Sequence, residues 1–497
     1  MFNSGHVYFK AGPSRSCTAA LYLVKTLEIA FQAAVQFFEN TFEHYSWAQE
    51  LAGILPLSFL IDFIEIPPKL HILQLVGTIP LWSWVITPSG SRVILAPDNG
   101  NEDCCQDSFS ATRPLEVLDG YYGERYFASN PETFRLVLQK QKLHKIENDH
   151  ENMRPNSDYQ RIQELEVIKF SRLSSPSSGS TSPCPSQYSD ACRGWRRTSL
   201  RYLITNYIGW FLLACLAITS AVFRLWISLA FFLIVPITGW TVSSLHGNQP
   251  RLPDHNDSSG QRMLVVCEHM NTARWLVLIG ESTLINSLLN RPLKQQRPPC
   301  SPSTKILLRL FLRICIAGQW GAAIAAAVTK GWSSYLISLW QCSIILFHAF
   351  LVTPSDAAKD WATRHARLKI QRFGIQASSR RALLNTIVAL NPNTFPATER
   401  GAPNRAKFFV TGMKWIDPIL TGSADRECWE EATRQAMIEA SKLKEMVGVS
   451  SAEAQPFLAD FPSQPWRDKF ARHYWMERIP EGILLADKLR DAIYPPE

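Results

Sequence analysis

The stretch that decides the architecture is residues 203–242, which read LITNYIGWFLLACLAITSAVFRLWISLAFFLIVPITGWTV. Arg224 is the only charged residue in it. One helix of this length would extend about 60 Å, roughly twice the thickness of a hydrocarbon core. The stretch therefore predicts two membrane spans. Arg224 belongs in the turn between them, because an arginine at the bilayer centre costs about 2.5–3.5 kcal/mol.

A second apolar hairpin is predicted at Ile306–Val328 and Trp332–Val352, joined by a short turn that contains Lys330. Small residues recur at a spacing of four along the first arm, which lets a neighbouring helix approach closely. We expect this face to pack against the first hairpin, with dimerisation as the alternative. Its residues are Ala317, Gly321 and Ala325.

The N-terminal part contains one further predicted span at Leu70–Pro88, which has no Asp, Glu, Lys or Arg. The preceding Leu51–Ile66 is apolar but contains Asp62 and Glu65. It is either an interfacial or re-entrant helix, or a poor span. Carboxylates within a membrane can relay protons or bind cations, so these two are candidate intramembrane carboxylates, although a position at the membrane surface explains them more simply.

The remaining segments are polar, and the organisation they predict is all-α. We expect about five spans, as two hairpins and one N-terminal span, with a cytosolic helical unit and a disordered linker. The N-terminal membrane region is residues 1–95, with its span at 70–88, and a polar linker follows at 96–201, which is Ser- and Pro-rich and disordered at 171–200. The first hairpin is 202–245, and a loop with an interfacial helix at 246–305 leads to the second hairpin at 306–353. The helical unit is 354–497.

Helices are predicted in the polar segments from their apolar spacing. Trp275–Leu289 is assigned to an interfacial helix because it is too short to span and contains Glu281. The other predicted helices are Pro131–Leu143, Asp158–Phe170, Asp356–Arg372, Arg380–Leu390, Asp425–Met446, Asp468–Met476 and Gly482–Tyr494.

Basic residues are concentrated after the second hairpin, where Lys359–Arg381 contains seven Lys or Arg and one acid, Asp360. A basic amphipathic helix at this position should lie on anionic lipid headgroups, at about 1 kcal/mol per cation near the surface. The residues assigned to membrane-surface contact are Lys359, Arg364, Arg367, Lys369 and Arg372.

The flanks of both hairpins are basic, whereas their turns carry only Arg224 and Lys330. Basic residues favour the cytoplasmic side, so both hairpins should enter and leave from the cytoplasm, with the C-terminus cytosolic. The glycosylation sequon at Asn256 should then remain unmodified. The N-terminus lies outside if only Leu70–Pro88 crosses, and inside if Leu51–Ile66 crosses as well.

Composition restricts the partners. The chain has 51 Lys and Arg against 43 Asp and Glu, and this mild positive charge fits a membrane surface better than nucleic acid, because no pattern of interleaved basic and aromatic residues accompanies it. Eleven cysteines without a CxxC pair indicate free thiols in a reducing compartment. The expected partners are the bilayer, anionic headgroups and other proteins, with no cofactor and no metal.

No phosphate loop, nucleophile elbow, HExxH or dinucleotide fingerprint is present in the sequence. His144 and Asp149 form the HxxxxD spacing of certain membrane acyltransferases, but in a charged run without a glycine-rich substrate motif, so chance is the better explanation. Cys267, Glu268 and His269 are consecutive and would point in different directions on a helix, which makes a poor metal site.

Two segments carry a resemblance: Trp275–Pro292, which ends SLLNRP, and Lys414–Leu420 (KWIDPIL) with the following Trp429-Glu430. Together they resemble predicted multi-pass membrane proteins of filamentous fungi that have no assigned activity, over about 201–446. The resemblance implies a membrane location and no function.

Three hypotheses for the function remain. The first is a non-enzymatic membrane scaffold or regulatory subunit, favoured by the polybasic segment, the Ser- and Pro-rich linker and the lack of catalytic motifs. The second is a transporter or channel subunit, for which Asp62 and Glu65 are the candidate charges. The third is a membrane-bound lipid-modifying enzyme, which depends on His144 and Asp149.

Overall fold

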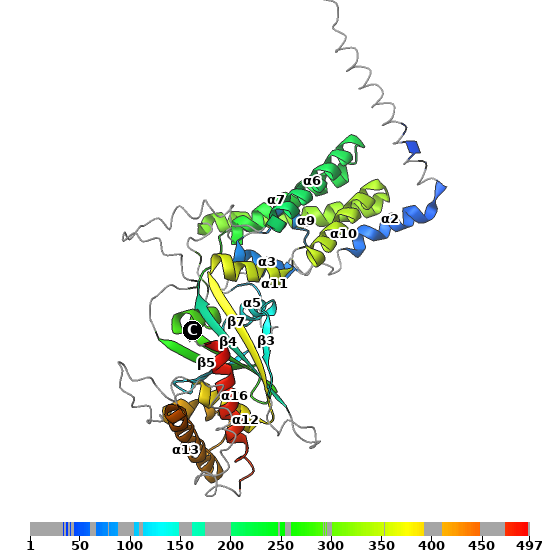
Figure 1. Cartoon of the computed structure of the whole chain (residues 1–497). Helices are drawn as coiled ribbons and strands as arrows, with labels where there is room; N and C mark the ends of the chain where they lie inside the picture. Colours follow the sequence, from blue (N-terminus) through cyan, green and yellow to red (C-terminus); the bar gives the residue numbers. More distant parts are fainter. Residues whose placement is uncertain are drawn as a thin grey trace, which may run out of the picture.

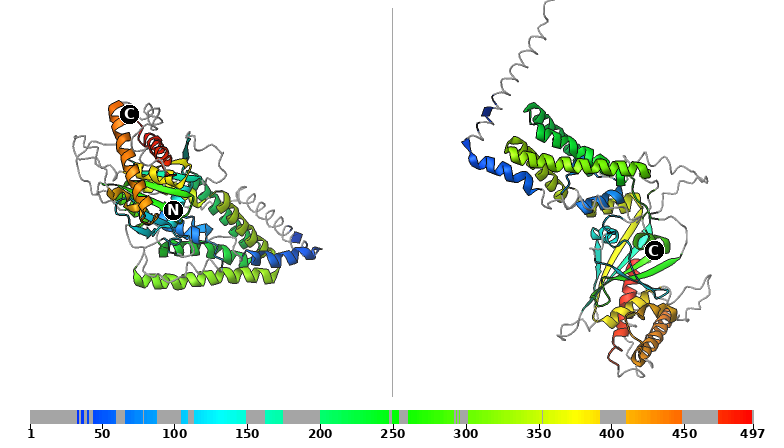
Figure 2. Two further views of the ribbon diagram at one scale, coloured as in Figure 1. Left: turned by 90° about the horizontal axis from the view of Figure 1, so that it is seen from below. Right: turned by 180° about the vertical axis from the view of Figure 1, so that it is seen from behind.

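The structure is a computed structural model of the chain. Apart from a few single positions, the residues it describes are 44–59, 66–77, 79–87, 104–108, 113–148, 162–173, 200–246, 249–253, 260–291, 301–351, 353–391, 410–447 and 473–495. Figures 1 and 2 show long helices at one end of the molecule, a sheet in the middle and further helices at the other end.

The centre is a mixed sheet of seven strands in the order β2-β1-β5-β6-β4-β7-β3. Two neighbouring pairs, β4 with β6 and β3 with β7, are parallel, and the other four pairs are antiparallel. The prediction of an all-α protein is therefore wrong, and the fold is α/β. The strands are β1 (Glu116–Asp119), β2 (Arg125–Phe127), β3 (Leu143–Ile146), β4 (Gln163–Arg172), β5 (Gln261–Cys267), β6 (Arg274–Glu281) and β7 (Leu368–Ala377).

Four helices are long and apolar enough to cross a membrane, at Tyr202–Val222, Trp226–His246, Ser303–Thr329 and Trp332–Phe350. They belong to α6 (Leu200–Val222), α7 (Trp226–His246), α9 (Pro302–Thr329) and α10 (Trp332–Phe350). Arg224 and Lys330 adopt the left-handed conformation in the two turns, where the sequence places them. The two hairpins were predicted correctly.

The predicted fifth span at Leu70–Pro88 is wrong. The chain there forms α3 (Ile66–Val76), turns at Gly77 with φ of 75°, and continues as the short 3-10 helix η1 (Leu81–Ser83). The positive φ at Gly77 breaks the helix there, and Pro80 lacks the N–H that would be needed to resume it at once. Before it, α2 (Ser46–Ser58) has 13 residues, about 20 Å, which is too short to span.

Both hairpins are inserted into the sheet. α6 and α7 lie between β4 and β5 in the sequence, and α9 and α10 lie between β6 and β7. Because β6 pairs with both β4 and β5, the two ends of the first hairpin return to one sheet. The second hairpin returns to the same sheet through β7, which pairs with β4.

The central strands β5 and β6 are apolar on both faces. In β5, Met263 and Val265 contribute to one core, whereas Leu264 and Val266 contribute to the other. Such strands are continuous apolar runs, which periodicity alone does not separate from helices. For this reason the helix predicted at Trp275–Leu289 is wrong over β6. The helices predicted at Asp158–Phe170 and Asp356–Arg372 are wrong over β4 and β7, because these two strands pair with each other, and a partner so distant in the sequence leaves no local signal.

One face of the sheet is covered by C-terminal helices. α12 (Arg380–Leu390) and α13 (Ala424–Val447) were predicted almost to the residue, and α16 (Arg478–Ile493) begins earlier than expected. These helices do not form a separate unit, since they share a core with the sheet that includes Val167, Val277 and Trp415.

The other face of the sheet shares its core with the membrane helices. This core runs without a break from Ile168 and Leu278 on the strands to Phe231 and Trp340 on the spans. Four helices lie in this region, and Figure 1 shows two of them, α3 and α11, between the long helices and the sheet. They are α3, α5 (Pro131–Gln139), α8 (Ser282–Leu289) and α11 (Pro354–Asp360), the last continued by the π-helical turn η5 (Trp361–His365).

Candidate functional site at the base of the bundle

The candidate site is centred on α3, which packs against α7 on one side and α11 on the other. Three of its polar side chains are buried: Lys69, His71 and Gln74. Buried polar groups are costly unless they form hydrogen bonds, so their partners decide what the site can do.

His71 has a partner at each ring nitrogen. Its Nδ1 accepts the main-chain N–H of Gln106 at 3.0 Å, so this nitrogen carries no proton. The neutral ring therefore holds its proton on Nε2, which donates to Thr133 Oγ1 at 3.0 Å. The Thr133 hydroxyl in turn donates to Asp107 Oδ2 at 2.6 Å. The result is a chain of hydrogen bonds from α3 to α5 and the turn at 104–108.

Asp107 also caps α5. Its Oδ1 accepts the main-chain N–H groups of Glu132 at 2.8 Å and Thr133 at 3.2 Å. The residue directly before the helix, Asn130, does not cap it, because its amide donates to Arg291 O instead. A carboxylate at a helix N-terminus is favoured by the free N–H groups and by the helix dipole. Asp107 thus fastens α5 to the base of the bundle.

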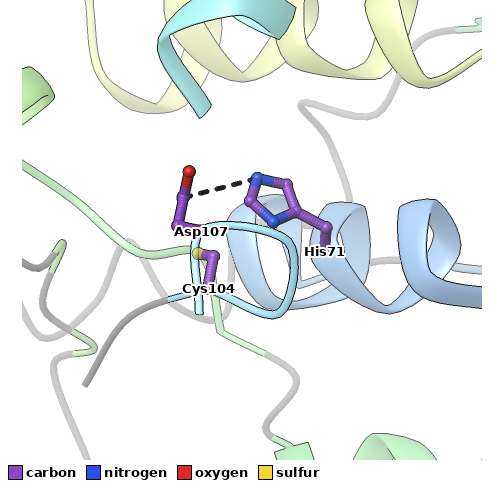
Figure 3. Close-up of side chains that lie close together, drawn as sticks. All are labelled: His71, Cys104 and Asp107. Carbon is purple, nitrogen blue, oxygen red and sulfur yellow. Dashed lines mark ion pairs between the residues drawn. The ribbon is translucent and has the colours of Figure 1, made fainter. Parts of the chain in front are cut away.

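Figure 3 shows that His71, Cys104 and Asp107 lie close together, and their ligand atoms are all within 4.8 Å of one another. They do not fit a metal centre. A metal at Nε2 needs the ring proton on Nδ1, but Nδ1 faces a main-chain N–H donor. Both oxygens of Asp107 are already acceptors. The hydrogen bonds account for the cluster without an ion.

The protonation states agree with this network. Burial lowers the pKa of His71 to about 3, with a further contribution from Arg251, so the ring is neutral at physiological pH. Burial raises the pKa of Asp107 to about 6, and the hydrogen bonds from Thr133 and Glu132 oppose that rise. Asp107 is therefore ionised at pH 7 and can act as the cap.

Gln74 connects α3 to the end of α7. Its Oε1 accepts the main-chain N–H of Cys105 at 2.6 Å, and its Nε2 donates to His246 Nδ1 at 3.4 Å. Burial raises the pKa of the Cys105 thiol to about 12, with smaller contributions from Cys104 and Asp107. Cys105 is therefore a neutral, unreactive thiol, which excludes a nucleophilic role for it at neutral pH.

Lys69 forms fewer hydrogen bonds than His71 or Gln74. It is 7% exposed, and its Nζ donates to the carbonyl of Ser83 at 3.3 Å. Burial lowers the pKa of Lys69 to about 7. Among the described residues no carboxylate forms an ion pair with Lys69.

Residues 79–87, here called the inserted segment, extend from α3 into the bundle in a largely non-helical conformation. Free main-chain groups at this depth must be bonded within the protein. Gln319 of α9 supplies two of these hydrogen bonds. Its Oε1 accepts from Ile86 N at 3.1 Å, and its Nε2 donates to Trp84 O at 3.0 Å. Trp320 Nε1 donates to Ile86 O at 2.9 Å.

Two glycines of the spans make room for the inserted segment. A Cβ at Gly209 of α6 would overlap the indole of Trp82, and a Cβ at Gly239 of α7 would overlap the carbonyl of Leu81. The close approach of the inserted segment to α6 and α7 therefore requires glycine at both positions.

The five basic residues assigned to the membrane surface do not lie on one helix, because β7 begins at Leu368. Lys359, Arg367 and Lys369 are exposed, and Arg364 lies 3.8 Å from Asp360. Arg372 is occupied inside the domain, where its Nε donates to Glu166 at 2.7 Å and its Nη1 to Leu138 O at 3.2 Å. Membrane contact by the exposed residues stays a prediction.

The small-residue face of α9 points away from the rest of the chain at two of its positions. Ala317 and Gly321 are exposed, Ala325 is half-buried, and no atom lies within 4 Å of a Cβ built at Gly321. A neighbouring face of α9 packs instead, with a Cβ at Gly318 lying 3.1 Å from Ile234 of α7.

Of the other predicted residues, those that the structure describes are not brought together. Asp62, Glu65, Asp149 and Asn256 lie outside the described residues. His144 is exposed on β3. Cys267 is buried at the end of β5, whereas Glu268 and His269 are exposed, so the three do not converge.

The sequence reasoning missed His71, Gln74, Thr133 and Gln319. A signal was present for the first two, since both are polar residues three apart in a stretch without charges. Thr133 and Gln319 carry no local signal, because their partners are more than 25 residues away in the sequence.

No protein-family model, curated protein or solved structure matches this chain.

Proposed function

We propose that this chain is a non-enzymatic membrane scaffold or regulatory subunit, in which a membrane-anchored α/β domain at the cytoplasmic surface binds other proteins. The observation that carries the proposal is the insertion of both hairpins into one sheet. Four covalent connections and a shared core hold the domain against the bundle, so it cannot swing away as a tethered domain would.

The chemistry of the candidate site supports this proposal over the lipid-modifying enzyme. His71 is neutral and bonded at both nitrogens, Asp107 is used as a helix cap, and Cys105 is a neutral thiol. A general base needs a free nitrogen or oxygen that reaches a substrate. The cluster therefore serves to join elements.

The cytoplasmic placement rests on charge. The segments that flank both hairpins are basic, whereas each hairpin turn carries a single basic residue, Arg224 or Lys330. The sheet, α12, α13 and α16 then lie in the cytoplasm.

An exposed aromatic group at the edge of the sheet is the surface we assign to partners. β2 is the last strand on its side of the sheet, and Phe127 on this strand is 60% exposed. Tyr121 and Tyr122, in the turn that leads to β2, are 48% and 64% exposed. Aromatic side chains are enriched in protein interfaces, and a free strand edge can pair with a partner strand.

A site-specific photo-cross-linker tests this surface in the full-length protein in its own membrane. Placed at Tyr122, it should form discrete cross-links to a partner, and these should disappear when Tyr121 and Phe127 are changed to Ser. Tyr474, which is 75% exposed on the C-terminal part, is the matched control and should give none. Cross-links equal at both positions, or absent at Tyr122, would refute the proposal.

A transporter or channel subunit is the second candidate, because two buried polar atoms on one face of α10 have no hydrogen-bond partner. Ser338 and Gln341 are 4% and 1% exposed, and Ser338 Oγ and Gln341 Oε1 form no hydrogen bond. Such groups inside a bundle are expensive and frequently line a pathway. Unchanged solute flux in a Ser338→Ala, Gln341→Leu protein reconstituted in vesicles would remove this candidate.

A further inference from the structure

Lys69 has no counter-ion among the described residues. It is the only lysine or arginine that is buried among them, at 7% exposure, and none of them supplies a carboxylate to it. Its one hydrogen bond within the described part of the chain, to the carbonyl of Ser83 at 3.3 Å, uses one of the three ammonium donors. A buried ammonium in this position is costly until an anion approaches it.

Two further features near Lys69 favour an anion. Lys69 lies in the first turn of α3, where the positive end of the helix dipole disfavours a cation and favours an anion. His348, in the last turn of α10, is close enough for a Coulombic interaction with Lys69. The Nε2 atom of His348 is buried and has no hydrogen-bond partner. Three features from two helices therefore favour a negative group at one place.

We propose that Lys69 and His348 bind a phosphate group at the base of the bundle. The phosphate belongs to an anionic phospholipid headgroup or to inorganic phosphate. The ammonium and the imidazole N–H donate to its oxygens, and charge-assisted hydrogen bonds of this kind are the strong ones. Lys69 lies where the long apolar helices meet the domain, and basic pockets between spans near the membrane surface bind lipid headgroups. The inference does not depend on the scaffold role.

The test uses the full-length chain in a neutral detergent, with thermal unfolding as the measure of binding. Three probes are titrated: short-chain phosphatidic acid, short-chain phosphatidylcholine and inorganic phosphate. We expect saturable stabilisation by phosphatidic acid or by inorganic phosphate. Stabilisation by phosphatidic acid alone identifies a headgroup site, whereas stabilisation by both identifies a site for the free anion, and either supports the proposal.

Variants connect the binding to Lys69. Lys69→Gln should weaken the apparent affinity at least about tenfold, since it removes the charge that pairs with phosphate, and Lys69→Arg should largely preserve it. Lys359→Gln is the matched control, because Lys359 is an exposed lysine on the neighbouring α11. If Lys69→Gln does not fold, His348→Phe replaces it, with at least about a threefold loss expected.

Several results would overturn the proposal. One is no stabilisation by either phosphate probe, and another is stabilisation by phosphatidylcholine that equals that by phosphatidic acid. A third is equal affinity in wild type, Lys69→Gln and His348→Phe. The last result concerns Glu65, which lies outside the described residues. Lys69→Gln is introduced both into the wild type and into a Glu65→Gln protein. If it lowers the unfolding midpoint of the wild type but not that of the Glu65→Gln protein, the counter-ion of Lys69 is the Glu65 carboxylate and not phosphate.

Discussion

His71 and Asp107 show how single residues hold this molecule together. His71 accepts from one segment and donates to another, and Asp107 supplies the cap that Asn130 does not give to α5. These residues stabilise the fold only when all their buried polar atoms have hydrogen-bond partners, because each lost partner leaves a buried polar group unpaired.

Asp107 gives the first prediction at this scale. Asp107→Ala should lower the free energy of unfolding by about 1–3 kcal/mol, because it removes the cap of α5 and the acceptor for Thr133. Asp107→Asn should cost less, since it keeps an oxygen for the cap. Glu268→Ala, at an exposed acid, is the control, and thermal unfolding followed by tryptophan fluorescence is the measurement. A wild-type midpoint for Asp107→Ala would contradict the assigned role.

Lys69 gives a pH prediction for the lipid-free protein. Its pKa is about 7 in the folded state and near 10.5 when unfolded, so between these values the unfolded chain binds more protons. Stability should therefore rise with pH across this window, by at most about 1.4 kcal/mol per unit. The pKa values of His71 and Asp107, about 3 and about 6, lie below this pH window, so these two groups do not contribute to the rise. Lys69→Met should remove the rise between pH 7 and 9, and an unchanged slope would show that another group causes it.

Among the elements, the inserted segment depends most on its neighbours. It is not a regular helix, yet residues 82–87 are all buried within the membrane bundle. Its main-chain groups are bonded by Gln319, Trp320 and Lys69. This arrangement is stable because the spans provide both polar side chains and close-packed glycines.

A pair of glycine substitutions tests this packing. Gly239→Ala should destabilise the protein, because the new Cβ meets the carbonyl of Leu81, and the loss should exceed the gain of about 1 kcal/mol in helix propensity. Gly321→Ala has the same propensity gain and open space around its Cβ, so it should be neutral or stabilising. Equal unfolding midpoints for the two variants would show that the inserted segment does not lie against Gly239.

At the scale of the whole molecule, the sheet dictates the arrangement of the spans. The strands that precede and follow each hairpin belong to one sheet, so the ends of both hairpins lie at that sheet. Hairpins that cross a membrane in this arrangement would have all their ends on one side and the two turns, at Arg224 and Lys330, on the other.

Cysteine labelling in sealed vesicles checks this arrangement. Arg224→Cys and Lys330→Cys should react with an impermeant maleimide from one side. Ser423→Cys, at an exposed position before α13, should react only from the opposite side. The unsubstituted chain measures the background from its own cysteines. Labelling of positions 224 and 330 from different sides would contradict the insertion of both hairpins into one sheet.

Elements with strong local signals could be predicted. The apolar run at 203–242, whose only charge is Arg224 in its turn, and the amphipathic helices α12 and α13 follow from periodicity and the cost of burying charge. The strands could not be identified in the same way, because β5 and β6 are apolar on both faces and look like helices or short spans.

By itself, the sequence determined that four helices, in two pairs, are long and apolar enough to cross a membrane, because hydrophobicity over about twenty residues is a local property. Only the tertiary structure decided that the polar segments between them form one sheet, that Leu70–Pro88 turns at Gly77 instead of spanning, and that His71 meets Asp107. These outcomes depend on partners distant in the sequence. Strand pairing and buried hydrogen bonds acquire their energy only when both partners are in place.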